Sequence, residues 1–380
     1  MSERLGRFAR FVPSGRVGLY AALRVLVSPG GSVLMSPVTD DVVLFVVLAA
    51  GLRPVMAPLR PGGGSLVMDR ISDEVLAGVS AVLSTHLYGV ADRVDELGER
   101  CRLRGIPLIE DAAHGLHTVR AGRRAGTFGD AAVFSFSKHL DPGAGGCLVA
   151  RDEPLLRELA RVCELESRVP SPAALVRARA RRRAVGLARR TGIAGLLRRR
   201  GVTERVLPAT RQGGHRMPLR LGALRSAMAA GPSIESLQPW LATDLPGYRS
   251  LPDATVLAGV ARFLRDIGAD RDARVEGTAA LLASLPRDET RAARGEPSPF
   301  FRVPLLVADR DAVRLRLRGF GVVADYVYDP PLDDYAGRDL ADPSPDPVGA
   351  RWWAAHALPI DPLQAPAATR ALRAIRPRFV

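Results

Sequence analysis

The stretch that decides the fold is IPLIEDAAH (residues 106–114), which is followed after a loop by AAVFSFSKHL (residues 131–140). Each begins with a short apolar run, typical of a buried strand, and each ends in side chains that can do chemistry. The first run delivers Asp111 and then His114, and the second delivers Ser135 and then Lys138. Because ligands of parallel sheets bind beyond the carboxyl ends of the strands, this order indicates one ligand site built from both strands.

Lys138 is the only lysine in a chain that carries 53 arginines. A primary amine can form a Schiff base with an aldehyde, whereas the guanidinium of arginine stays protonated. The place of this lysine at the end of a predicted strand therefore indicates a chemical role. The alternative is that it is a remnant of a bias toward arginine and that its position has no meaning.

Apolar runs and amphipathic stretches alternate through the first 150 residues. Helices are expected at 16–27, 42–51, 72–79 and 91–104, and strands at 32–36, 54–57, 81–85, 106–111, 131–136 and 147–150. This alternation is typical of the α/β class, with a mostly parallel sheet covered by helices on both faces.

The pattern changes after about residue 245. A long helix is expected at 254–282, a strand at 300–307, a helix at 308–321, a strand at 322–328 and a short helix near 367–374. We therefore expect a large domain over residues 1–244 and a small C-terminal α+β domain over residues 245–380.

The net charge of +14 is concentrated in one place, since residues 177–200 hold ten arginines and no acid. We expect a basic helical segment over 174–201. It could cover the mouth of a site and attract a phosphorylated substrate, lie on an anionic membrane surface, or bind nucleic acid without specificity. We favour the first, because arginine suits a diphosphate; contact with a membrane surface stays an open alternative.

Other features of the sequence exclude several classes of protein. The three cysteines, Cys101, Cys147 and Cys163, lack metal-binding spacing, and reduced thiols are expected. His114 and His117 stand three apart without a further ligand at suitable spacing, so no metal site is expected. The longest apolar run, 42–51, is about half of what a bilayer requires, and the first residues include no apolar leader region. These features favour a cytoplasmic protein.

The parts of a pyridoxal phosphate site occur together in this chain. Ser14 and Gly15 precede a predicted helix, whose free N–H groups and positive dipole end can hold a phosphate. Asp111 can keep a pyridine nitrogen protonated, which makes the ring an electron sink. Singly, each residue has an ordinary alternative: Asp111 could cap a helix and Ser135 could be buried and hydrogen-bonded. Their joint order favours the cofactor.

Through these residues the chain resembles the DegT/StrS-type sugar aminotransferases, which are fold-type I pyridoxal phosphate enzymes. The matching stretches are PSGRVGLYAAL (13–23), STHLYGVADRVDEL (84–97), PLIEDAAH (107–114), GRRAGTFGDAAVFSFSKHLDPGAGG (122–146) and GHRMPLRLGALRSAM (214–228), with a looser match from residue 300.

The resemblance implies a role for each matching residue. Lys138 would form the Schiff base with the cofactor and move the proton, Asp111 would pair with the pyridinium nitrogen, and His114 would lie near the phenolic oxygen. The other residues implied around the cofactor hold its phosphate or line its pocket: Ser135, the backbone of Ser14, Gly15 and Arg16, and further Thr39 and His86.

The resemblance also implies the reaction. It is amination of a keto sugar, often nucleotide-linked, by glutamate or glutamine, in glycan or natural-product biosynthesis, by a homodimer. Two departures motivate an alternative: Asp40 follows Thr39, where an aromatic that stacks on the cofactor is common, and Gly214 stands where the family has an asparagine. That alternative is an elimination or dehydration on the same fold. A third hypothesis is a non-catalytic relative that binds anionic membrane or nucleic acid through the basic segment.

Overall fold

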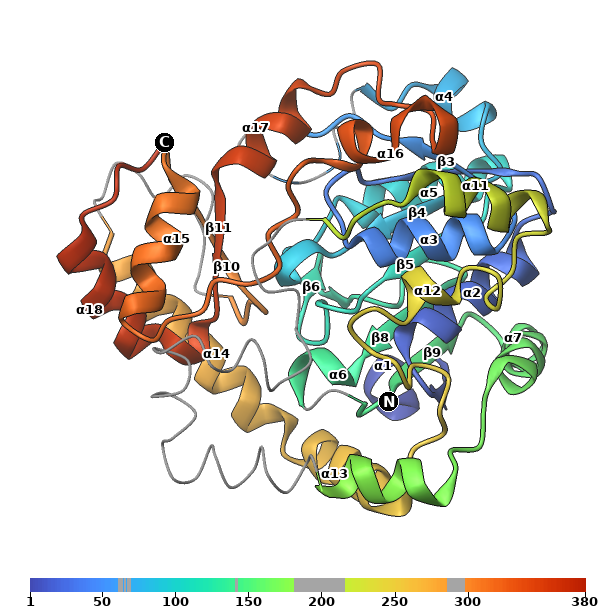
Figure 1. Ribbon diagram of the computed structural model, residues 1–380, viewed down its shortest axis with the longest axis horizontal. Coiled ribbons are helices and arrows are strands. Elements are labelled where there is room, and N and C mark those ends of the chain that lie inside the picture. The colour runs from blue at the N-terminus through green and yellow to red at the C-terminus, as the bar shows by residue number, and fades with distance from the viewer. Residues whose placement is uncertain (61–63, 65, 67–69, 141–142, 181–215, 286–297) are drawn as a thin grey trace.

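The computed structural model describes residues 1–60, 64, 66, 70–140, 143–180, 216–285 and 298–380. A large sheet carries helices on both sides, and a smaller group of helices surrounds a two-stranded sheet beside it (Figure 1). The α/β class predicted from the sequence is confirmed.

The large sheet has seven strands in the order β1-β9-β8-β5-β4-β2-β3. Its strands are β1 (Phe8–Val12), β2 (Ser32–Met35), β3 (Arg53–Met56), β4 (Ala81–Thr85), β5 (Leu108–Asp111), β8 (Ala131–Ser135) and β9 (Gly146–Ala150). Strand β9 runs antiparallel to both of its neighbours, while the pairs from β8 to β3 are parallel. The carboxyl ends of β4, β5 and β8 therefore meet at one edge of the sheet.

The helices of the large sheet are α2 (Gly15–Leu26), α3 (Asp41–Ala49), α4 (Asp73–Ala77), α5 (Val94–Arg104), α7 (Glu153–Glu166), α11 (Leu221–Ala229) and α12 (Gln238–Leu241). Four of them, α2, α3, α4 and α7, begin at a side-chain oxygen that caps the first turn. Ser14 accepts from the backbone N–H of Val17 at the start of α2, and Asp152 caps α7 in the same way. Helix α3 is apolar all round because it is buried on every side, between α2, α12, β3 and the C-terminal helix α16 (Leu332–Leu340).

The C-terminal part of the chain contains α13 (Ala254–Arg265), α14 (Ile267–Ala283), β10 (Val303–Leu306), α15 (Arg310–Gly319), α16 (Leu332–Leu340), α17 (Val348–His356), β11 (Ala357–Ile360) and α18 (Ala365–Ile375). Five of these elements, α14, β10, α15, β11 and α18, share a second core. Strands β10 and β11 pair antiparallel, and α14, α15 and α18 pack around them.

Two expectations for this part are wrong. The single helix expected at 254–282 is two helices, since α13 ends and α14 begins on either side of Asp266. Residues 322–328 form no strand, because Tyr326 has a φ of 61° and so breaks the extended backbone. The partner of β10 is instead β11, more than fifty residues further along the chain.

The division into domains at 244/245 stays a prediction. Helices α16 and α17 return to the large sheet, where Leu332 and Leu340 join one apolar cluster and Trp353 joins another. Most of the basic segment, 181–201, lies outside the described residues, and so does Gly214. Residues 172–180 are helical and lie beside α13, to which Arg179 is linked through Asp253. Among the described helices, none has the length and apolar character needed to cross a membrane.

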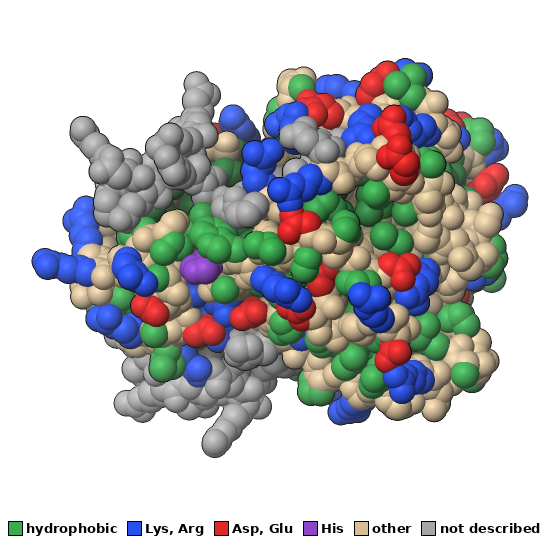
Figure 2. Space-filling model, turned by 90° about the horizontal axis from the view of Figure 1, so that it is seen from above, with side chains coloured by type: hydrophobic (Ala, Val, Ile, Leu, Met, Phe, Trp, Pro, Cys, Tyr) green, Lys and Arg blue, Asp and Glu red, His purple; other side chains and the backbone are tan. Residues whose placement is uncertain are grey.

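Charges of both signs are mixed on the surface. On the face shown in Figure 2, basic and acidic side chains lie interspersed instead of forming one basic patch. Exposed ion pairs of the surface include Arg53 with Asp342 and Arg351 with Asp334. The observation agrees with a nearly balanced charge outside the basic segment.

Glycine allows a close approach between α14 and the 3-10 turn at Pro362–Gln364. A Cβ at Gly277 would overlap the carbonyl oxygen of Pro362, whereas a Cβ at Gly259 in α13 would meet nothing within 4 Å. We expect Gly277→Ala to lower the free energy of unfolding by about 2 kcal/mol, since the turn must move. Gly259→Ala should leave it unchanged or raise it by about 0.5–1 kcal/mol. Urea unfolding midpoints would test this, and equal midpoints would contradict the close contact.

Candidate active site

A pocket lies at the edge of the sheet where β4, β5 and β8 end. Of the residues predicted from the sequence, eight line it: Gly15, Arg16, Thr39, His86, Asp111, His114, Ser135 and Lys138. Ser14 lies beside it as the capping residue of α2. The structure thus brings together the predicted residues from segments more than a hundred residues apart.

The start of α2 forms one wall of the pocket. Gly15 lies so close to β8 that a Cβ there would be 3.7 Å from the Cβ of Ser135. Gly15 and Ser135 both line the pocket, so the first turn of α2 and Ser135 lie side by side at the positive end of the helix dipole. The guanidinium of Arg16 is bound to Asp244 and to the carbonyl of Leu241, and its backbone N–H belongs to the start of the helix.

Asp111 ends β5 and is buried. Its Oδ1 accepts a hydrogen bond of 3.0 Å from the backbone N–H of Ala113. Burial raises the pKa of this carboxyl, and the negative charge of Asp40 adds to the effect. A positively charged group in the pocket would reverse the shift, so the site favours a cationic nitrogen beside Asp111.

Glu110, the residue before Asp111, points to the opposite face of the sheet and is fully buried. Its carboxylate accepts backbone N–H bonds from Gly126, Phe128 and Gly129 at 2.7–2.8 Å, and it lies 2.9 Å from Nε2 of His86. Burial works to raise the pKa of Glu110, but these hydrogen bonds outweigh it and hold the pKa below its usual value. The carboxylate thereby fixes both His86 and the 126–129 loop that leads into β8.

Lys138 lies in α6 (Phe136–His139), the single turn that follows β8. Its Nζ is 3.7 Å from Oδ2 of Asp40 and lies over the ring of Tyr326, 4.3 Å from the centroid. Burial works to lower the pKa of Lys138, and the nearby acids Tyr326 and Asp40 outweigh it, so the pKa is raised. Asp40 also caps α3 through Oδ1, which fixes its position against the lysine.

His114 is held between aromatic rings. It stacks on Phe301 with centroids 4.3 Å apart, and its Nδ1 accepts from the backbone N–H of Tyr88. Burial and the charge of Lys138 lower the pKa of His114 well below its usual value. The ring is therefore neutral at pH 7, and Nδ1 is the acceptor of its two nitrogens.

Sequence reasoning missed two important residues. The positive φ of Tyr326 has no signal in DYVYD, since this conformation usually goes with glycine or asparagine. The second is Glu110: its place beside Asp111 in the sequence gives no signal of its four partners, which come from other segments. Tyr328 also lines the pocket. Arg302 is buried against Asp325 at 2.8 Å and Asp361 at 3.2 Å.

Comparisons with known proteins agree with this geometry. Residues 6–174 match the DegT/DnrJ/EryC1/StrS aminotransferase family. Over 159 residues the chain is 28% identical to GDP-perosamine synthase of Vibrio cholerae, covering 41% of this chain and 43% of that protein. It is 30% identical over 155 residues to dTDP-4-dehydro-2,3,6-trideoxy-D-glucose 4-aminotransferase of Saccharopolyspora spinosa, covering 40% of each. The matched part spans less than half the length of these curated relatives.

Solved structures extend the likeness to the whole fold. An aminotransferase from Psychrobacter cryohalolentis matches with a TM-score of 0.63 at 15% identity, over 99% of this chain and 89% of that one. NtdA from Bacillus subtilis, solved with bound cofactor PMP, matches with a TM-score of 0.55 at 16% identity, over 98% and 74%. The chain therefore has the fold of the type I pyridoxal phosphate aminotransferases.

The pair of Asp40 and Lys138 can be tested directly, because the chain has one lysine. We expect Asp40→Asn to lower the pKa of Lys138, since removing the carboxylate charge destabilises the ammonium form. Reductive ¹³C-methylation of the cofactor-free protein gives one dimethyllysine signal, separate from the N-terminal amine, whose titration reports this pKa.

A matched control for that titration is Asp342→Asn, which removes a surface carboxylate paired with Arg53. It should leave the Lys138 titration unchanged. If Asp40→Asn and the wild type titrate at the same pH, Asp40 does not stabilise the charged lysine.

The Glu110 carboxylate can be tested through stability. Glu110→Gln puts an NH₂ group where backbone N–H donors converge, leaving buried donors unsatisfied. We expect it to lower the free energy of unfolding by about 3 kcal/mol. Glu99→Gln removes an exposed carboxylate paired with Arg102 and should change it by less than about 0.5 kcal/mol. Chemical denaturation of both variants checks this, and equal losses would count against a central role for Glu110.

Proposed function

We propose that this chain is a pyridoxal phosphate-dependent aminotransferase that transfers an amino group from glutamate or glutamine to a keto sugar, often nucleotide-linked, in glycan or natural-product biosynthesis. The observation that carries the proposal is the convergence of Lys138, Asp111 and the start of α2 on one pocket. The match of residues 6–174 to an aminotransferase family, and relatives named for GDP- and dTDP-linked sugars, support it.

The residues of the pocket fit pyridoxal phosphate. A buried carboxyl whose pKa is raised would be stabilised as carboxylate by a pyridinium nitrogen, and Asp111 offers this. Ser135 and the backbone at Ser14, Gly15 and Arg16 would hold the phosphate. Lys138 offers the one lysine amine to the aldehyde carbon, while Thr39, His86 and His114 would line the remaining sides. When bound, the cofactor supplies an electron sink for the carbon that carries the amino group.

Proton transfer falls to Lys138. Its Nζ lies inside the pocket, with the side chain 19% exposed, so in its neutral amine form it can take a proton from a substrate carbon and return it at another position. Asp40 favours the protonated state of this amine and holds it on the side of α3. The ring of Tyr326 packs against the same amine.

The oligomeric state and the cellular location are also part of this proposal. We expect a homodimer, as in the enzymes that the sequence resembles, and light scattering of the purified protein would measure its mass. The basic segment could attract the diphosphate of a nucleotide-linked sugar. A cytoplasmic location stays a prediction.

A second candidate function keeps the cofactor and changes the outcome of the reaction to elimination of water. The observation that favours elimination is Asp40, which lies beside Lys138. In the enzymes that the sequence resembles, an aromatic that stacks on the cofactor is common at this position. Single-turnover assays separate the two: an aminotransferase converts an added amino donor to its keto acid without any sugar, and an enzyme confined to elimination does not.

The role of Lys138 can be tested by substitution. We expect Lys138→Ala and Lys138→Arg both to lower the rate of amino transfer by more than about 10³-fold, because the arginine keeps the charge but cannot act as a base. Borohydride reduction followed by peptide mass spectrometry should place the cofactor on Lys138 of the wild type. Turnover by Lys138→Ala at the wild-type rate would rule out the proposed mechanism.

A further inference from the structure

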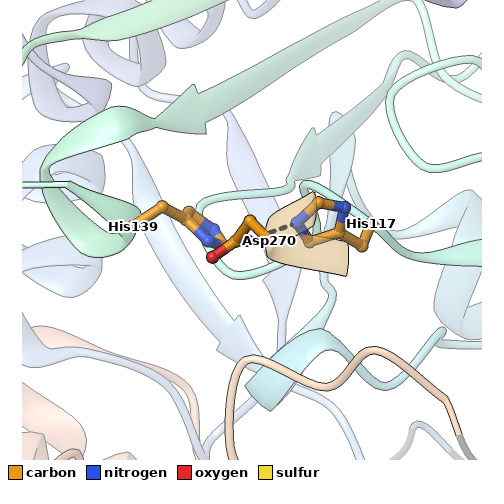
Figure 3. A group of neighbouring side chains, drawn as sticks. All are labelled: His117, His139 and Asp270. Carbon is orange, nitrogen blue, oxygen red and sulfur yellow. Dashed lines mark hydrogen bonds and ion pairs between the residues drawn. The ribbon is translucent and has the colours of Figure 1, made fainter. Parts of the chain in front are cut away.

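A cluster of three side chains lies behind the pocket, outside the proposed cofactor site. His117 comes from the loop after β5, His139 from the last position of α6, and Asp270 from α14 (Figure 3). One donor atom from each lies within 4.8 Å of the others. Nε2 of His117 is 2.7 Å from Oδ2 of Asp270, and the two imidazole rings are 6.0 Å apart and nearly perpendicular.

Most of the imidazole nitrogens of this cluster make no hydrogen bond within the described part of the chain. Nδ1 of His117 and both ring nitrogens of His139 are buried, and among the described residues they have no hydrogen-bond partner. A buried polar atom without a partner costs about 1–3 kcal/mol, so three in one place call for an occupant.

We propose that His117, His139 and Asp270 bind a divalent transition-metal cation of the zinc class. Two imidazoles and one carboxylate are a common donor set for such ions, with the remaining position open to water. Oxygen-seeking ions such as Mg²⁺ would find one carboxylate only, so they fit this donor set poorly. The inference does not depend on the proposed function.

The charge around the cluster allows a cation. Nε of Arg274 is 2.9 Å from Oδ2 of Asp270 and opposes a cation at that oxygen. Its Nη1 is engaged elsewhere, 3.8 Å from Asp361 and 3.4 Å from the carbonyl of Phe301, so two carboxylates share its charge. Arg274 can then act as the outer partner that orients the carboxylate, as ligating acids usually have.

A cation bound to this cluster would link the turn after β8 to helix α14. His139 follows Lys138 directly in the turn after β8, and Asp270 belongs to a helix of the C-terminal part. A bound cation would fix the lysine-bearing turn to α14 through direct bonds. It would place no ligand in the pocket, so its loss should loosen the turn that carries Lys138 without removing a group from the pocket.

The test is metal binding by the full-length chain with its cofactor present. After equilibrium dialysis against Zn²⁺ and, separately, Co²⁺, we expect about one ion per chain by mass spectrometry. The Co²⁺ form should show the visible bands of a low-coordinate nitrogen- and oxygen-bound ion. His139→Gln and Asp270→Asn should each weaken binding by at least about tenfold.

The variants have distinct purposes. His139→Gln leaves the pairs of Asp270 with His117 and Arg274 intact, so loss of binding there reports a lost ligand instead of a broken ion pair. His356→Gln is the matched control, because its Nδ1 bonds the Trp352 carbonyl away from the cluster; its affinity should equal the wild type. If the wild-type protein retains no ion after dialysis, the cluster binds only water and the proposal is wrong. Wild-type affinity in His139→Gln would also overturn it.

Discussion

The carboxylate of Glu110 holds the site together, because it satisfies backbone groups that have no ladder partner. Three N–H groups of the 126–129 loop converge on its two oxygens, and His86 approaches one of them from the adjacent strand end. A buried charge persists only when hydrogen bonds replace its lost hydration, and here the loop supplies them. The loop in turn sets where β8 begins, and so where Ser135 and Lys138 end up.

The pocket next to Glu110 contains a few charged side chains that lie close together. Asp111 and Asp40 are the acids that line it, and Lys138 stands between the sheet edge and α3. Each acid alters the protonation of its neighbours: Asp40 helps to raise both the pKa of Lys138 and that of Asp111. A cofactor that brings a cationic nitrogen and an anionic phosphate would meet an acid at one end and a helix start at the other.

Local sequence was sufficient for much of the fold. Strands β2, β3, β4, β5, β8 and β9 are predicted by apolar runs, because a strand buried on both faces consists mostly of apolar residues. The errors fall where tertiary contacts override local pattern. Residues 322–328 read as a strand from their alternation, yet Tyr326 takes a left-handed conformation with its hydroxyl-bearing ring over Lys138 and its carbonyl bonded by Tyr88. Strand β1 was missed because its alternating residues are only partly buried.

The sequence by itself determined the chemistry: one amine, placed after a strand, downstream of an acid and of a helix that can hold phosphate. Residue type and order are local, so they can be read along the chain. Only the tertiary structure decided which charge faces that amine. Asp40 meets Lys138 because α3 starts beside the turn that follows β8, and His139 meets Asp270 because α14 crosses behind it. Such pairs depend on the packing of elements about a hundred residues or more apart, and no spacing in the sequence encodes them.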